Sequence, residues 1–121
     1  MPQWRIGTLI MFIVDEKDLQ YRFGDSGPKY LMRGPRMNYA MVQFPPNTDF
    51  TAHYHNIMEE NFYVIEGTIE VTVDGVTHTL TPGQFIHVEP KEVHYLRNTS
   101  NTVCKLVSTL APFVDVDKVE V

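Results

Sequence analysis

The chain consists mainly of short runs in which apolar and polar residues alternate, separated by clusters of turn-forming residues. A period of two is typical of β-strands with one buried face, because successive side chains point to opposite sides. No long segment keeps apolar residues at the 3.6-residue spacing of a helix, so the pattern predicts an all-β protein. The expected strands are Arg5–Val14, Leu19–Phe23, Lys29–Met32, Met37–Phe44, Thr51–His55, Asn61–Glu66, Thr68–Val73, Val76–Leu80, Gln84–Val88, Val93–Arg97 and Val103–Leu110.

Turn residues between these runs support the same architecture. Asp74-Gly75 lies between two apolar runs and predicts a two-residue hairpin, because such a turn needs positive φ at both central positions. Asp25-Ser26-Gly27-Pro28 and Arg33-Gly34-Pro35 are expected to form further turns. Many short strands at regular spacing indicate a sandwich or a barrel.

Composition narrows the function classes. A chain of 121 residues fits one domain, and a net charge of −5 without a dense Lys/Arg run argues against nucleic acid as principal partner. The single cysteine, Cys104, excludes an internal disulfide and suits a reducing cytoplasm, so a cytoplasmic protein is expected. Because Cys104 lies in an apolar strand, we interpret it as a buried small hydrophobic residue.

The N-terminal run Ile6–Val14 is the one segment that resembles a targeting signal. It is too short to span a bilayer and leads into Asp15-Glu16-Lys17-Asp18 rather than a small-residue cleavage site, so no membrane partner is expected. The run is more hydrophobic than a free edge strand should be. We therefore interpret it as a buried or partner-facing strand and predict a homodimer.

Three histidines and one glutamate form the candidate metal site. His53 and His55 point to the same side of one strand, and His94 lies on a separate strand. Glu60 has the wrong parity for the His53 strand, so a turn or bulge at residues 56–58 must precede it. Three imidazoles and a carboxylate suit one divalent transition metal, whether iron, manganese, nickel, copper or zinc.

Glu59 competes with Glu60 for the carboxylate role. Alternation lets only one of two adjacent residues point inward. Glu60 shares a face with Phe62 and Val64, whereas Glu59 shares the opposite face with Asn61. We prefer Glu60.

Two segments carry a family resemblance. Residues 47–67, with His53, His55, Glu60 and Gly67, resemble the first conserved motif of cupins. Residues 82–98, from Pro82-Gly83-Gln84 through His94 to Asn98, resemble the second. Together they cover about half the chain. The resemblance implies a small double-stranded β-helix, a jelly-roll-like barrel, with metal ligands at His53, His55, Glu60 and His94.

The chain departs from the family pattern at three positions. Asn47 replaces the first glycine, and asparagine is well able to hold positive φ. Glu89 replaces a proline and Lys91 a glycine of the second motif, in a turn where Pro90 can still fix the bend. As domain organisation we expect one cupin-like domain over 1–121, with N-terminal strands in 1–35 and the barrel core in 36–110.

The remaining histidines have other interpretations. His78 lies in an apolar stripe after the Asp74-Gly75 hairpin, so a partnered packing role is expected. His87 is not expected to bind the metal; the alternative is that it orients one of the ligands through a hydrogen bond.

Parity with the ligands also predicts the pocket lining. Phe62 lies on the face of Glu60, and Leu96 on the face of His94. On the strand Met37–Phe44, the small Ala40 suggests that its face, which also carries Asn38, borders a narrow cavity. We predict these four residues as substrate-binding; ordinary barrel core is the alternative.

The ligand set leaves three functional hypotheses open. A divalent ion with three neutral imidazoles and one carboxylate keeps a charge of +1, which favours a small anionic or chelating substrate. The first hypothesis is a metal-dependent enzyme, a dioxygenase-like oxidoreductase, isomerase or lyase, with Glu60 as a possible base. The second is a non-catalytic module that binds a sugar or small molecule, and the third is a structural or stored metal. An octahedral ion would keep two open positions, whereas tetrahedral zinc would be filled.

Overall fold

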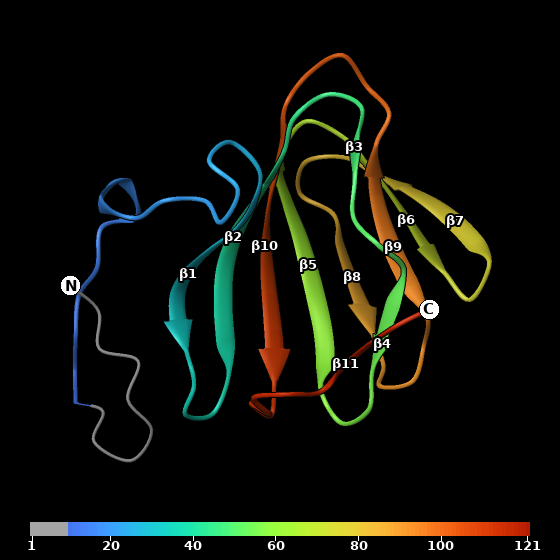
Figure 1. Cartoon of the computed structure of the whole chain (residues 1–121). Helices are drawn as coiled ribbons and strands as arrows, with labels where there is room; N and C mark the ends of the chain where they lie inside the picture. The colour runs from blue at the N-terminus through green and yellow to red at the C-terminus, as the bar shows by residue number, and fades with distance from the viewer. Residues whose placement is uncertain (1–9) are drawn as a thin grey trace.

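The strands form two antiparallel sheets that face each other around one hydrophobic core (Figure 1). The computed structural model describes residues 10–121. The first sheet has the strand order β1 (Gly27–Arg33), β2 (Asn38–Phe44), β10 (Cys104–Ala111), β5 (Glu59–Glu66) and β8 (Phe85–Val88). The second has the order β11 (Lys118–Glu120), β4 (His53–His55), β9 (His94–Asn98), β6 (Ile69–Val73) and β7 (Val76–Leu80), with β3 (Thr48–Asp49) paired to β9.

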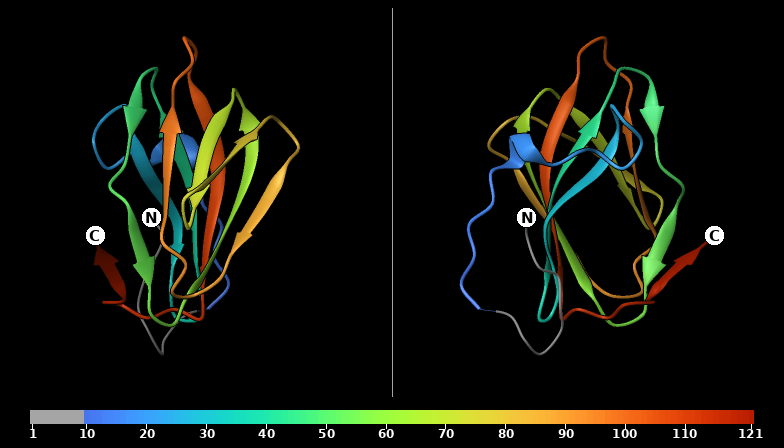
Figure 2. Two further views of the ribbon diagram at one scale, coloured as in Figure 1. Left: turned by 90° about the vertical axis from the view of Figure 1, so that its right-hand side faces the viewer. Right: turned by 60° about the vertical axis from the view of Figure 1, so that its left-hand side comes forward.

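This arrangement confirms the all-β, double-stranded β-helix architecture. Turning the molecule shows the two sheets as separate layers (Figure 2). Their facing sides alternate apolar residues toward the interior, and the most deeply buried hydrophobic side chains are Phe44, Val64, Ile69, Val71, Val88, Cys104 and Leu106. Burial also raises the pKa of the Cys104 thiol to about 11, so Cys104 is a packing residue rather than a nucleophile.

Two predicted turns have the expected backbone. Asp74 and Gly75 have φ values of 46° and 84° and join β6 to β7 as a hairpin. Asn47 has a φ of 57°, which explains why asparagine can stand where the family pattern has glycine. Lys91 also has positive φ, at 75°, so the turn keeps its left-handed residue without a glycine.

The N-terminal strands differ from the prediction. Residues 5–9 lie outside the described part of the chain, and residues 10–14 are not in a strand. The predicted strand Leu19–Phe23 is reduced to one isolated bridge between Tyr21 and Gly24. The one helix assigned in residues 10–121 is the short 3₁₀ turn η1 (Glu16–Asp18), which precedes it. Hydrophobic composition alone was misleading here, because a strand also requires a neighbouring chain segment for its hydrogen bonds.

The expected packing role of His78 is wrong. His78 pairs with Val71, which is fully buried, yet the His78 side chain is exposed. The reason is that β7 is the edge strand of its sheet, and Val76, Thr77 and Thr79 on it are also exposed. Alternation along an edge strand therefore does not imply burial of either face.

Residues 10–121 contain no helix that is long and apolar enough to cross a membrane.

Candidate metal centre

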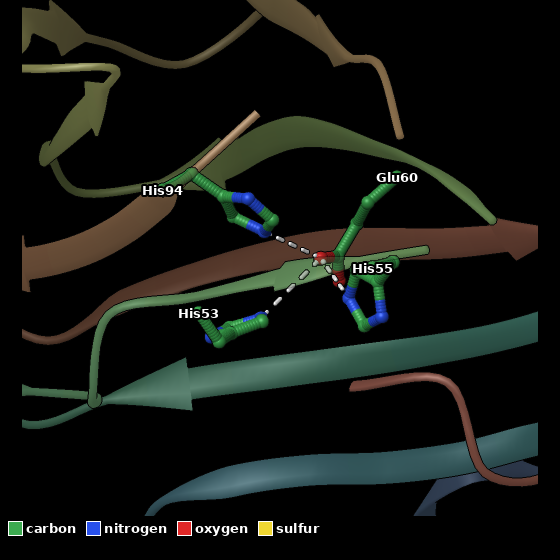
Figure 3. Close-up of side chains that lie close together, drawn as sticks. All are labelled: His53, His55, Glu60 and His94. Atoms are coloured by element: carbon green, nitrogen blue, oxygen red, sulfur yellow. Dashed lines mark hydrogen bonds and ion pairs between the residues drawn. The ribbon is translucent and has the colours of Figure 1, made fainter. Parts of the chain in front are cut away.

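Three strands bring the four predicted ligands to one point inside the barrel (Figure 3). β4 carries His53 and His55 on the same face, and β5 carries Glu60. His94 begins β9 and is the direct cross-strand partner of His53. Residues 56–58 form no strand, so the turn expected before Glu60 is present and reverses the parity that would have pointed Glu60 outward.

The geometry centres on one carboxylate oxygen. Oε1 of Glu60 lies 2.9 Å from Nε2 of His94, 3.2 Å from Nε2 of His55 and 3.9 Å from Nε2 of His53. The four candidate ligand atoms all lie within 4.8 Å of one another. His55, Glu60 and His94 are buried, and His53 is half-buried.

Backbone contacts orient two of the imidazoles. Nδ1 of His53 lies 2.9 Å from the carbonyl oxygen of Thr51, and Nδ1 of His94 lies 3.0 Å from that of Glu92. A carbonyl oxygen only accepts, so Nδ1 carries the proton in both rings and donates it. In the neutral rings, Nε2 therefore presents a lone pair to the centre, as a metal ligand does.

This donor set fits a divalent metal. With Nδ1 protonated, the Nε2 lone pairs of His53 and His94 face the Glu60 carboxylate, so acceptors face acceptors unless a cation lies between them. A proton on one imidazole or a metal ion can supply that positive charge. Imidazole nitrogen and carboxylate oxygen are ligands that first-row transition metals accept.

The close contact between Glu60 and the imidazoles shifts the pKa values of Glu60 and His94. Burial raises the pKa of Glu60, but its interactions with the imidazoles of His53, His55 and His94 outweigh burial and bring the pKa well below its ordinary value. Burial lowers the pKa of His94, but its hydrogen bond to Glu60 and the charge of that carboxylate raise the pKa above its ordinary value overall. Without a metal, a proton shared by His94 and Glu60 is therefore favoured.

Ser108 on β10 holds the other oxygen of the carboxylate. Its Oγ donates a hydrogen bond to Oε2 of Glu60 over 2.8 Å, and Ser108 is buried. Our sequence interpretation missed Ser108. A signal was present, because on β10 Cys104, Leu106 and Ser108 share a face, and a serine in an otherwise apolar inward face calls for a partner.

The C-terminal segment fixes the turn that separates the ligands. Asp117 is buried, and its Oδ2 accepts hydrogen bonds from the backbone N–H groups of Ile57 and Met58, each over 2.9 Å. The following strand, β11, pairs with β4 and places Lys118 opposite His55. Burial raises the pKa of Asp117, but hydrogen bonds from the turn's amides lower it overall. Neither Asp117 nor β11 was predicted from the sequence.

A cavity of about 350 Å³ opens beside the four ligands. All four residues predicted to bind substrate line it, namely Asn38, Ala40, Phe62 and Leu96. His53, His55, Glu60 and Ser108 also border the cavity, whereas His94 does not. Its volume lies within the range of small-molecule sites, and aromatic side chains supply much of its wall.

Glu59 and His87 lie on the outside of the same sheet. Oε2 of Glu59 accepts a hydrogen bond from Asn61, and His87 is bonded to Asn61 and Glu89. The hydrogen bond to Glu89 is the main reason that the pKa of His87 is raised. None of these contacts reaches the four candidate ligands, so Glu60 is the carboxylate that β5 turns inward.

The fold and the ligand cluster define a double-stranded β-helix with a histidine-rich interior, and the sequence comparison gives its family. Residues 40–110 match the family described as Cupin domain. The chain belongs to the cupin family, as its two motifs indicated.

Known relatives share part of their length with this chain. Protein SchB of Streptomyces halstedii is 40% identical over 77 residues, which are 63% of this chain and 54% of SchB. Quercetin 2,3-dioxygenase of Bacillus subtilis is 37% identical over 68 residues, which are 56% of this chain and 20% of that protein. The chain thus spans about half of one relative and a fifth of the other.

A solved structure shows the same fold. The polyketide cyclase RemF from Streptomyces resistomycificus superposes with a TM-score of 0.78 at 18% identity, covering 90% of this chain and 84% of RemF. Two cupin sheets of this kind therefore form in chains of very different sequence.

Proposed function

We propose that this chain is a metal-dependent cupin enzyme that acts on a small, oxygen-rich substrate. The observation that carries the proposal is the position of His53, His55 and Glu60 in the wall of a cavity large enough for a small molecule. A metal with a merely structural role has no need of such a cavity. A divalent metal held there by His53, His55, Glu60 and His94 would supply Lewis acidity toward a substrate oxygen.

Charge and lining favour a particular kind of substrate. Three neutral imidazoles and one carboxylate around a divalent ion leave a charge of +1, which favours an anionic or chelating oxygen group. Phe62 and Leu96 give the adjoining wall an apolar surface, which we expect to contact the apolar part of the ligand. Dioxygen insertion, isomerisation and decarboxylation are the reaction classes we propose, and the similarity to a quercetin 2,3-dioxygenase supports the first.

Glu60 is the residue we propose to move a proton. Between the imidazoles its pKa is low, so it stays an anion and is a weak base. If Oε1 leaves the imidazoles while Ser108 retains Oε2, the factors that lower the pKa weaken and burial raises it. In that position Glu60 can accept a proton from the substrate.

A substrate screen tests the proposal. The protein, purified without chelator and analysed for metal, is incubated with candidate small acids and enediols or flavonols, with and without dioxygen. Turnover that depends on the bound metal is expected. A protein that holds metal and binds these compounds but converts none of them would instead support the non-catalytic binding module.

We also propose a homodimer in the cytoplasm. Ile10, Met11 and Ile13 are exposed in the described structure and lie outside its sheets. A second copy of the chain would bury these apolar side chains.

A further inference from the structure

We propose that Asn38 accepts a hydrogen bond from a hydroxyl group of the substrate, and that the substrate is a ring-shaped oxygen chelator that carries this hydroxyl opposite its chelating oxygens. The inference rests on the proposed function, because the chelating end must face the metal ligands. It adds a second polar contact at the far side of the cavity and thereby specifies the shape of the ligand.

Asn38 has an unused acceptor in a buried position. It begins β2, is 6% exposed, and lines the cavity. Its Oδ1 is buried and has no hydrogen-bond partner within residues 10–121. A buried amide oxygen without a partner is unfavourable, and a turn of the amide toward the cavity that Asn38 lines would let a bound molecule donate to it. Ser108, another buried hydrogen-bonding side chain of the wall, already donates to Glu60.

The strand register gives the distance between Asn38 and the ligand cluster. Asn38 pairs with Leu110 on β10, and Leu110 pairs with Glu60 on β5, so the three residues form one row across neighbouring strands. Two strand spacings separate the α-carbons of Asn38 and Glu60 by about 10 Å. Both side chains border the same cavity with Leu110 between them, so a substituted six-membered ring lying over Leu110 has about the length to reach from one to the other.

The next row of the sheet provides room for a flat ring. Ala40 on β2 pairs with Ser108 on β10, and Ser108 pairs with Phe62 on β5. Two small residues hollow the wall, and the Phe62 ring beside them offers an aromatic surface. Tyr30 and Phe50 also line the space. Aromatic rings prefer planar partners, so the lining matches a ring better than a flexible chain.

Two pyranones that differ in one hydroxyl test the inference. Kojic acid and allomaltol share the same chelating hydroxy-ketone, but only kojic acid carries a hydroxyl at the opposite side of its ring. Each is titrated by calorimetry into protein loaded with one equivalent of Ni²⁺, for the wild type and for Asn38→Leu. Nickel content and melting temperature are measured for both proteins, so that loss of metal or of folding is recognised.

We expect kojic acid to bind the wild type about tenfold more tightly than allomaltol, the effect of one hydrogen bond in a buried site. Asn38→Leu should abolish this difference. Equal binding of the two probes by the wild type would overturn the inference without need of the variant, as would a preference that persists in Asn38→Leu or a failure of both probes to bind. A wild type that retains no nickel would overturn the proposed function itself.

Discussion

Ser108 and Glu60 lie 48 residues apart in the chain, yet the Ser108 hydroxyl donates a hydrogen bond to Glu60 Oε2 over 2.8 Å. The contact fixes the carboxylate so that its other oxygen faces the three imidazoles. Ser108→Ala should weaken metal binding about 10- to 100-fold, the usual effect of losing a group that orients a ligand. Metal titration of the two proteins measures this.

The neighbouring hydroxyl on β10 offers a matched control. Thr109 points outward and accepts a hydrogen bond from Asn61. Thr109→Ala should therefore leave metal affinity unchanged. Equal losses of affinity in Ser108→Ala and Thr109→Ala would show that β10 acts only through general stability and not through the Glu60 carboxylate.

Acid should release the metal. The pKa of metal-free His94 is raised, chiefly by its hydrogen bond to Glu60, which outweighs the lowering effect of burial. A raised pKa means that protons compete with the metal at a higher pH than they would at an ordinary imidazole, so metal affinity falls as pH decreases and should be largely lost by about pH 5. Dialysis at a series of pH values, followed by metal analysis, measures the loss. Unchanged retention at about pH 4.5 would contradict ligation by imidazole.

Asp117 should matter for stability and for the ligand turn. Its carboxylate accepts the Ile57 and Met58 amides, and its pKa is lowered. A depressed pKa means that the stabilisation is present at neutral pH and is lost as pH falls through that pKa. Asp117→Asn should lower the free energy of unfolding by roughly 1–3 kcal/mol at neutral pH and by less in acid. Urea unfolding at both pH values measures the difference.

The exposed Asp115, two residues earlier, provides the control for this experiment. Asp115→Asn removes the same charge from the same segment but no contact with the turn, so its unfolding free energy should remain that of the wild type. If Asp117→Asn and Asp115→Asn behave alike at neutral pH, the hydrogen bonds to residues 57 and 58 are not what stabilises the segment.

The dimer proposal predicts a mass. Light scattering at micromolar concentration should give twice the chain mass of 14.0 kDa. Replacing Ile10, Met11 and Ile13 with serine should shift the mass toward the monomer, because these exposed apolar side chains are the proposed contact. A wild type that has the mass of one chain would contradict the proposal.

The cupin barrel could be predicted from the sequence because its strands and turns are specified by neighbouring residues. Alternation identifies the strand faces, and the Asp74-Gly75 and Asn47 turns require backbone conformations that few residues adopt. The parity argument also separated Glu60 from Glu59, which the structure places on opposite faces of β5. Patterns of this kind can be recognised without knowing which distant residues they contact.

Features that depend on distant partners were missed. β11 has three residues, too few for a periodic pattern, and it forms because β4 offers an edge. Asp117 is recognisable only through its contacts with the turn at residues 57 and 58, some 60 positions away. Conversely, the edge position of β7 leaves His78 exposed, a fact that the alternation of Val76–Leu80 could not reveal.

The metal content of three purified proteins tests the central claim most directly. We would purify three proteins without chelator: the wild type, His53→Ala and His78→Ala. Each is equilibrated with a divalent metal, and its metal content is measured by inductively coupled plasma mass spectrometry. His53 contributes Nε2 to the buried cluster, whereas His78 lies exposed on β7. We predict about one metal ion per chain in the wild type and in His78→Ala, and almost none in His53→Ala. Full metal content in His53→Ala, or its loss in His78→Ala, would contradict the account.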